Sequence, residues 1–313
     1  MGRLKQYIKQ PKERGKIMND RNFMKMLEAQ WDKGNFVCVG LDSEFGKIPE
    51  SAFRSGNECG VSFANTVVAF NRAIIEATKD LVCAYKPNIA FYETHGEEGI
   101  AALHRTIADI RVIAPDVPVI LDAKRADIGN TDTGYIQMAF KYLQADAITV
   151  HPYLGAEALK PFLDRADKGI IVLCRTSNPG AGEFQDLPVH SDPLYLGEPL
   201  YHYIARSVAI RWNKNNNCVL VVGATYPEEL KKIRRVVGDL PILIPGIGFQ
   251  QKDVPLEKQV EQVVSAGRDS RRRGMIINSS RGIIFASKGP DFAEAARRET
   301  EKLHNLINKY RCA

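Results

Sequence analysis

Three charged residues follow one apolar run with the spacing Asp-x-Lys-x-x-Asp, and they are Asp122, Lys124 and Asp127. The run 118–121 has the composition of a buried β-strand, which places these charges at the end of a strand. Charges in such a place are costly unless they pair or take part in chemistry. A structural ion-pair cluster is one interpretation, and an acid–base site is the other. A further lysine, Lys86, ends another apolar run and favours the second interpretation.

The four charged residues alternate in sign, so each can stay ionised in a partly dry pocket because its neighbours neutralise it. Lys124, between two aspartates, would remain protonated. A fixed ammonium can donate a proton to a developing carbanion and stabilise it electrostatically. Asp122 would crowd an anionic group of a substrate and favour the loss of that group.

Short apolar runs rich in Val and Ile alternate with segments of helical periodicity. Runs buried on both faces are typical of a parallel sheet covered by helices. Eight strands alternating with helices predict an α/β fold, a (β/α)8 TIM barrel. The expected strands are 36–42, 82–88, 118–124, 147–152, 169–176, 218–224, 241–247 and 274–280.

In such a barrel the carboxyl ends of the strands form the catalytic face. The first predicted strand ends in Asp42. Gly246 and Gly248 follow the seventh strand, and Arg281 follows the eighth. Glycines let the backbone approach a ligand, and a guanidinium suits phosphate oxygens, so this end of the barrel is expected to bind a phosphate. A tight turn and a surface ion pair are the alternatives for these residues.

The 313 residues fit one barrel domain, 21–313, preceded by a basic extension, 1–20. The extension carries six basic and two acidic residues, or +4 of the formal net charge of +6, so the rest is nearly neutral and indicates no nucleic-acid partner. No apolar run is long enough to predict a membrane span. No histidine or cysteine pattern indicates a metal site, and the cysteine usage suits the cytoplasm.

The long Gly- and Pro-containing connection 177–193 is a candidate lid.

The segments quoted above resemble the orotidine 5′-phosphate decarboxylase family, in its longer subgroup, from about residue 35 to residue 285. The segment Asp-Ala-Lys-Arg-Ala-Asp-Ile at 122–128 carries most of the resemblance. Matching segments occur in the same order at 40–42, 85–88, 176–180, 184–185, 245–248 and 280–282. The resemblance implies cofactor-free decarboxylation of orotidine 5′-monophosphate to uridine 5′-monophosphate, the last step of pyrimidine synthesis.

The resemblance also implies roles for individual residues. Lys124 would protonate C6, Asp122 would face the substrate carboxylate, and Lys86 and Asp42 would contact the ribose. The remaining assignments are Asp127 and Thr131, which would reach into the site of the partner subunit in a homodimer; Ser177, which would contact the pyrimidine; Gln185, which would bridge the lid to the phosphate; and Gly246, Gly248 and Arg281, which would hold the phosphate. Thr176 and Asn178 are open alternatives to Ser177 as the contact to the base.

Two other functions remain as alternatives. Metal-dependent sugar-phosphate decarboxylases and aldolases of the same superfamily share Asp-x-Lys-x-x-Asp. By this resemblance, an acidic residue would be expected at the end of their second strand. Here that position holds Lys86, and a cation there opposes metal binding. The second alternative is a nucleotide-binding barrel without catalytic activity.

Overall fold

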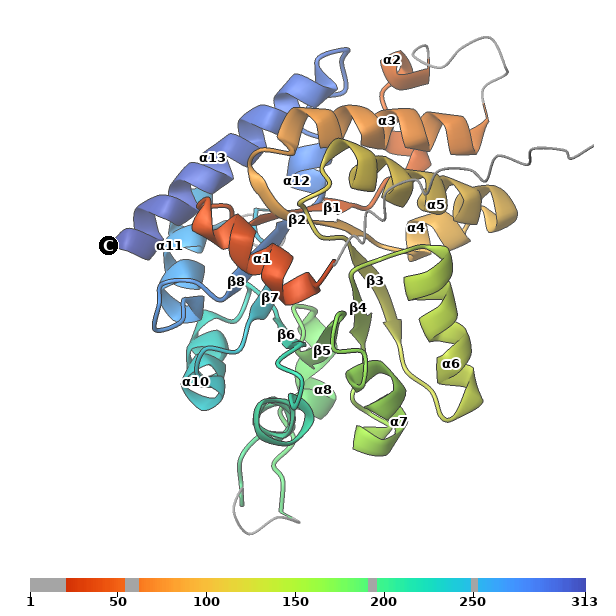
Figure 1. Ribbon diagram of the computed structural model, residues 1–313. Coiled ribbons are helices and arrows are strands. Elements are labelled where there is room, and N and C mark those ends of the chain that lie inside the picture. The colour runs from red at the N-terminus through yellow and green to blue at the C-terminus, as the bar shows by residue number, and fades with distance from the viewer. Residues whose placement is uncertain (1–20, 54–61, 191–195, 249–252) are drawn as a thin grey trace, which may run out of the picture.

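The computed structural model describes residues 21–53, 62–190, 196–248 and 253–313. The predicted extension 1–20 and residues 191–193 of the candidate lid lie outside the described residues. One sheet of eight parallel strands forms the centre of the molecule (Figure 1). The strands are β1 (Val37–Leu41), β2 (Val82–Pro87), β3 (Ile120–Arg125), β4 (Ala147–Val150), β5 (Gly169–Arg175), β6 (Cys218–Val222), β7 (Ile242–Pro245) and β8 (Met275–Ser279).

The sheet closes into a barrel. Ladders join neighbouring strands in the order β2-β1-β8-β7-β6-β5-β4-β3. The two outermost strands of this order, β2 and β3, meet through isolated parallel bridges that pair Tyr85 with Val119 and Asn88 with Asp122. The backbone N–H of Tyr85 donates to the carbonyl oxygen of Pro118 at 3.1 Å. The predicted (β/α)8 barrel is therefore confirmed, with a sparsely bonded seam between β2 and β3.

Helices surround the barrel and connect its strands (Figure 1). They pack against strands that are almost fully buried: β1, β2, β4, β6 and β8 are buried along their whole length. The longer helices are α1 (Phe23–Asp32), α3 (Phe63–Thr78), α5 (Gly96–Ile113), α7 (Gly155–Leu163), α10 (Pro227–Val237), α11 (Leu256–Gly267) and α13 (Phe292–Cys312). The shorter ones are α2 (Glu50–Phe53), α4 (Ala90–Glu93), α6 (Asn130–Ile136), α8 (Gly182–Gln185), α9 (Leu200–Arg206) and α12 (Arg281–Ile284). Two π-helical turns continue α6 and α9, at Gln137–Tyr142 and Ser207–Trp212.

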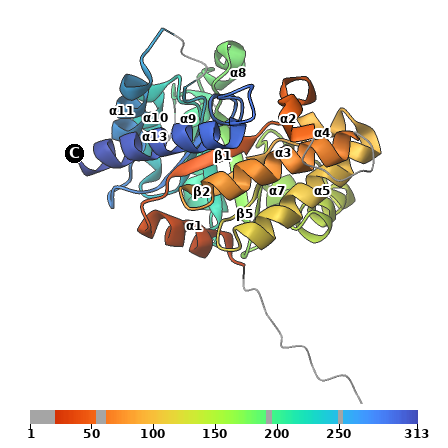
Figure 2. The same ribbon diagram turned by 90° about the horizontal axis from the view of Figure 1, so that it is seen from above.

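Helix α1 closes the amino-terminal end of the barrel. Its side chains meet the first residues of several strands: the indole N–H of Trp31 donates to the carbonyl of Met275 at 2.9 Å, and the ring of Phe23 packs against Gly169. Figure 2 shows α1 and α8 at opposite ends of the barrel. The carboxyl ends of the strands therefore lie at the opposite end of the barrel from α1, on the face where α8 lies.

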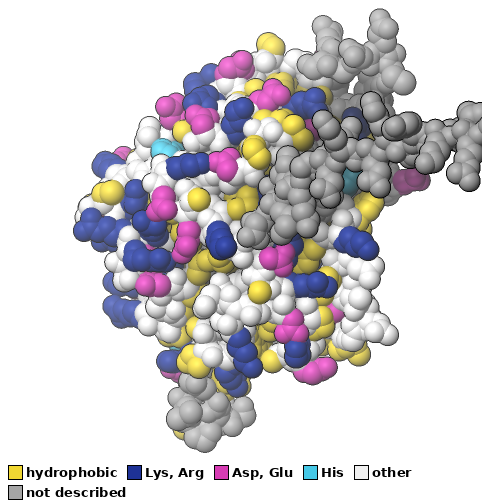
Figure 3. Space-filling view, viewed as in Figure 1, with side chains coloured by type: hydrophobic (Ala, Val, Ile, Leu, Met, Phe, Trp, Pro, Cys, Tyr) yellow, Lys and Arg dark blue, Asp and Glu magenta, His cyan; other side chains and the backbone are white. Residues whose placement is uncertain are grey.

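All eight predicted strands are present, and most end one or two residues earlier than predicted. In seven of the eight strands, the residues that close the predicted run leave the ladder and enter the loops of the carboxyl-terminal face, whereas β3 continues one residue further, to Arg125. Helix α3 shows how the helices cover the barrel, since its Val67, Phe70 and Ile74 are fully buried. Lys, Arg, Asp and Glu side chains are interspersed over the face in Figure 3. Among the described residues, no helix combines the length and apolar character that a bilayer crossing requires.

Candidate active site

A cavity of about 150 Å³ opens at the carboxyl ends of the strands. Strands β2, β3, β7 and β8 and the residue that follows β1 contribute to its wall, so the cavity brings together parts of the chain that are far apart in sequence. Its lining residues are Asp42, Lys86, Asn88, Asp122, Pro245, Gly246, Ile247, Asn278, Ser279, Ser280 and Arg281. Five of the residues predicted from the sequence are therefore in one place.

Asp122 is the centre of an ionic network. Its Oδ2 lies 2.9 Å from Lys86 Nζ, and its Oδ1 lies 2.7 Å from Lys124 Nζ. Lys86 Nζ also lies 4.0 Å from Asp42 Oδ1. The Lys86 side chain is only 4% exposed, whereas Lys124 is 51% exposed. The ammonium of Lys86 is therefore buried at the wall of the cavity, whereas Lys124 is half exposed and does not line the cavity.

Burial and charge oppose one another in setting the pKa values of this network. Burial alone would raise the pKa of Asp122, but Lys86 and Lys124 outweigh it and hold that pKa well below its ordinary range. Burial alone would lower the pKa of Lys86, but Asp122 and Asp42 raise it well above its ordinary range. Both groups are therefore ionised at neutral pH, as the alternating charges predicted.

Two buried oxygens in the wall of the cavity lack hydrogen-bond partners among the described residues. They are Oδ1 of Asp42 and Oδ1 of Asn278. Buried acceptors are normally satisfied, so unpaired ones at the wall of a cavity are suited to a ligand that brings hydroxyl or N–H donors. Asn278 lies inside the apolar run of β8 and is not among the site residues predicted from the sequence. A lone amide near the end of a buried strand was the available signal.

Of the three residues predicted to bind the phosphate, two line the cavity and Gly248 does not. Gly246 and Arg281 line the cavity. Gly246 has a φ of +106°, a conformation that only glycine adopts readily. The N–H of Gly248 already donates to Oε1 of Gln259 at 3.0 Å. Gly40 of β1 also matters here, because a Cβ at that position would lie 1.9 Å from Oγ of Ser280. The absence of a side chain at Gly40 therefore lets the end of β8 approach β1.

Asp127 and Thr131 lie outside the cavity of their own chain. Oδ1 of Asp127 accepts from the N–H of Ile128 at 2.7 Å. Thr131 lies on α6 and is exposed. Within the described part of this chain, Asp122 is the only carboxylate within ion-pair distance of Lys124. The structure of one chain therefore does not bring Asp127 to Lys124.

The candidate lid lies against the end of β5. Gln185 binds Thr176 through both its amide atoms: Oε1 accepts from the N–H of Thr176 and Nε2 donates to its hydroxyl, each at 2.9 Å. The Thr176 hydroxyl in turn donates to Oδ1 of Asn178 at 2.7 Å. Ser177 packs against Gly223, and its carbonyl oxygen accepts from the hydroxyl of Thr225 at 3.2 Å. None of Thr176, Ser177, Asn178 and Gln185 lines the Asp42–Arg281 cavity.

Arg175 fixes this part of the lid to the barrel. It is the last residue of β5, and its guanidinium donates to Oδ2 of Asp186 at 3.1 Å. The same guanidinium lies 4.1 Å from the ring centroid of Tyr226. Arg175 is 4% exposed, so its contacts are largely shielded from water. The position of Gln185 therefore depends on a contact between β5 and the residue after α8.

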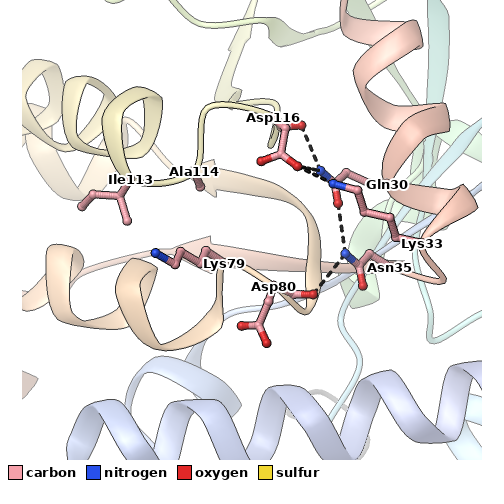
Figure 4. A pocket seen from close by; sticks show the side chains of 8 residues that line it. All are labelled: Gln30, Lys33, Asn35, Lys79, Asp80, Ile113, Ala114 and Asp116. Atoms are coloured by element: carbon pink, nitrogen blue, oxygen red, sulfur yellow. Dashed lines mark hydrogen bonds and ion pairs between the residues drawn. The ribbon is translucent and has the colours of Figure 1, made fainter.

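A second pocket lies at the amino-terminal end of the barrel (Figure 4). It is formed by the end of α1 and by the segments that precede β1, β2 and β3. Several of its polar groups pair with one another: the amide of Gln30 donates to Oδ2 of Asp116 at 3.1 Å, and the amide of Asn35 donates to Oε1 of Gln30 at 3.0 Å. Barrel enzymes act at the opposite end, so this pocket is not the candidate active site.

The closed barrel and the charged cavity at its carboxyl-terminal face define the class of the protein as an α/β-barrel enzyme. A sequence model of the family described as orotidine 5′-phosphate decarboxylase / HUMPS matches residues 36–298. The chain therefore belongs to this family, and the resemblance seen in the sequence is confirmed.

Individual relatives agree with the family match. The chain is 45% identical to the orotidine 5′-phosphate decarboxylase of Cellvibrio japonicus over 288 residues, which cover 92% of this chain and 98% of that protein. It is 48% identical to the enzyme of the same name from Herpetosiphon aurantiacus over 274 residues, covering 88% and 93%. The solved structure of Leishmania donovani OMP decarboxylase superposes with a TM-score of 0.76 at 35% identity, covering 93% of this chain and 99% of that one.

Proposed function

We infer that this chain is a carboxy-lyase that converts orotidine 5′-monophosphate to uridine 5′-monophosphate and CO2, the last step of UMP biosynthesis. The relatives that carry this name match the chain over nearly its whole length. The observation in the structure that supports the inference best is the pairing of Asp122 with both Lys86 and Lys124 beside one cavity.

The proposed reaction needs no cofactor. The bond between C6 and the carboxylate breaks, CO2 leaves, and the electron pair stays on C6. The ammonium of Lys124 then transfers a proton to C6 and is reprotonated from solvent. Asp122, which stays ionised, would face the departing carboxylate and disfavour the bound ground state. The cation of Lys124 would stabilise the charge that develops on C6.

The remaining cavity residues would position the substrate. Oδ1 of Asp42, which accepts no hydrogen bond from the described residues, would accept one from a ribose hydroxyl. Lys86, held by Asp122, would contact the same sugar. Gly246, Gly248 and Arg281 would hold the phosphate. Binding energy at the phosphate, remote from C6, can then be used to orient the reacting end.

We assign the pyrimidine contact to Ser177 and the link between lid and phosphate to Gln185, within a lid of residues 177–193. In the described part of this lid, Gln185 is bonded to Thr176. Because Gln185 does not line the Asp42–Arg281 cavity, a contact with the phosphate would need this part of the lid to move on substrate binding. Closure of this kind commonly excludes water from an active site.

We propose a homodimer in which Asp127 and Thr131 complete the site of the partner subunit. Both residues lie outside the cavity of their own chain, Lys124 is half exposed, and the neighbouring Ile128 is 62% exposed. Mixing two inactive variants, Lys124→Ala and Asp127→Ala, tests this arrangement. Each mixed dimer contains one site with both residues intact, so activity should return to roughly a quarter of the wild-type value. Shared sites are refuted if the mixture stays inactive although mixed dimers form.

The metal-dependent alternative is disfavoured by Lys86. Its ammonium occupies the end of β2, 2.9 Å from Asp122, where a divalent cation would need an acidic ligand. Among the described residues, no three His, Cys, Asp or Glu side chains are arranged to hold a metal ion.

The proposed partners are the nucleotide substrate and a second copy of the chain, without nucleic acid or membrane. The cytoplasm is the proposed compartment, consistent with four buried free thiols at Cys38, Cys83, Cys174 and Cys218.

An absorbance assay with orotidine 5′-monophosphate, with and without EDTA, tests the function. The expected result is turnover that survives exhaustive chelation. Lys124→Ala should remove the proton donor and abolish turnover while the protein still binds uridine 5′-monophosphate. Turnover that requires an added metal ion would refute the cofactor-free reaction. Nucleotide binding without turnover by the wild-type protein would favour the non-catalytic alternative.

A further inference from the structure

A threonine from the neighbouring strand binds the backbone and the carboxylate of the ionic network. Thr149 lies in β4 and is 1% exposed. Its Oγ1 accepts from the backbone N–H of Ala123 at 3.0 Å and from that of Lys124 at 2.9 Å. The same hydroxyl donates to Oδ1 of Asp122 at 2.9 Å. One buried side chain thus contacts three consecutive residues of the Asp-x-Lys segment.

The direction of these hydrogen bonds is determined. A hydroxyl has two lone pairs and one proton. Two backbone N–H groups can only donate, so both lone pairs of Thr149 are used, and its proton is left for Asp122. The carboxylate is then held from three sides, by Thr149 and Lys124 on Oδ1 and by Lys86 on Oδ2.

The backbone at this point explains why a side chain is needed. Pairing of β3 with β4 runs regularly through Leu121, opposite Ile148, and then jumps to Arg125, opposite Val150. Residues 122–124 therefore bulge out of the ladder opposite Thr149. Lys124 adopts a φ of +49°, a left-handed conformation that is unfavourable for a residue with a side chain. Bulges next to active sites commonly redirect a side chain, and here the side chain is the proton donor.

We propose that Thr149 is a positioning residue, whose hydroxyl holds the β3 bulge so that Asp122 and Lys124 reach the substrate in the correct geometry. The proposal rests on the function assigned to those two residues. Thr149 does not line the cavity, and its hydroxyl binds Asp122, which does. Its effect should therefore appear in the chemical step and leave the binding of the phosphate and ribose nearly unchanged.

Isosteric and conservative replacements test the proposal. Thr149→Val keeps the shape and removes the hydroxyl, and it should lower kcat by about 10- to 100-fold, the range typical of one lost hydrogen bond to a charged group. The affinity for uridine 5′-monophosphate should change by less than about threefold. Thr149→Ser restores the hydroxyl and should recover most of kcat. Thr300→Val is the control, because Thr300 is also buried and donates to a backbone carbonyl at 2.7 Å, but on α13.

The outcomes separate the proposal from the function on which it rests. If Asp122→Asn is inactive and Thr149→Val has wild-type kcat, the role of Thr149 is refuted alone. If Asp122→Asn is fully active, the assigned function of the network is refuted. Equal losses in Thr149→Val and Thr149→Ser would show that packing matters and the hydroxyl does not. Should the valine variant fail to fold, Thr149→Cys, which has only a weak donor, is compared with Thr149→Ser by the same criterion.

Discussion

Replacing Asp122 with asparagine should expose the cost of a buried charge that has lost its partner. The substitution keeps the size of the side chain and removes its negative charge. Lys86, 4% exposed, then loses its carboxylate at 2.9 Å and keeps only Asp42 at 4.0 Å. Breaking a buried ion pair from one side costs about 3–5 kcal/mol, because the remaining charge has lost its nearest counter-ion and has no water in its place.

The expected shift in melting temperature follows from the size of the chain. The entropy of unfolding is about 2.1 cal/mol/K per residue, or roughly 0.66 kcal/mol/K for 313 residues. A loss of 3–5 kcal/mol then lowers Tm by about 5–8 °C. Glu257→Gln is a matched control: it removes a carboxylate 2.7 Å from Lys309 in an exposed pair, and it should leave Tm unchanged within error.

The loss of stability in Asp122→Asn should also depend on pH, and it should become smaller as pH rises. In the wild-type protein the pKa of Lys86 is raised, so its stabilising contribution is complete below an unfolded pKa of about 10.4 and is lost only as pH rises through the folded pKa. In Asp122→Asn, the effect of burial should outweigh that of the remaining Asp42, and the pKa of Lys86 should fall below the unfolded value. The unfolded chain then binds more protons, and stability rises with pH towards about 10.

Thermal unfolding of both proteins between pH 7 and pH 9.5 measures this effect. The stability gap between wild type and Asp122→Asn should narrow as pH rises. Adding Lys86→Met removes the unpaired ammonium and should recover most of the lost stability without restoring activity. A deficit below about 1 kcal/mol, or a gap that stays constant with pH, would contradict the reasoning.

Two further predictions concern other residues. Arg281→Ala should lower kcat/KM by roughly 100-fold and weaken inhibition by inorganic phosphate, because the guanidinium is one of the proposed phosphate ligands; steady-state kinetics that match the wild type would remove Arg281 from the site. Arg21→Ala should lower stability by about 3–5 kcal/mol, because Arg21 Nη2 lies 2.6 Å from Oδ2 of the fully buried Asp146. Since this pair is remote from the cavity, kcat of the folded variant should be unchanged, and a normal Tm would contradict its structural role.

The barrel was predictable because burial on both faces leaves a strong mark on the sequence. Each strand is a short run of Val, Ile and other apolar residues, and each is followed by a polar or glycine-rich end. The sites on those ends, such as Asp42, Lys86 and Arg281, could therefore be assigned to one face before their distances were known. Their convergence in one cavity follows from the parallel arrangement of the strands.

The parts that could not be predicted depend on contacts between distant segments. The bulge at residues 122–124 is stabilised by Thr149, which reads in the sequence as an ordinary member of an apolar strand. The place of Gln185 depends on the contact of Arg175 with Asp186, and no local pattern encodes the path of that loop. The environment of Asp127 depends, in the proposed dimer, on a second chain. Local sequence patterns carry none of these relations.

The seam between β2 and β3 gives the ionic network a second consequence. Lys86 belongs to β2 and Asp122 to β3, so their ion pair clasps the barrel where backbone bonding is thinnest. A motion that parted these strands would also separate Lys86 from Asp122. Closure of the barrel at this seam and the neutralisation of the buried Asp122 carboxylate thus rely on the same contact.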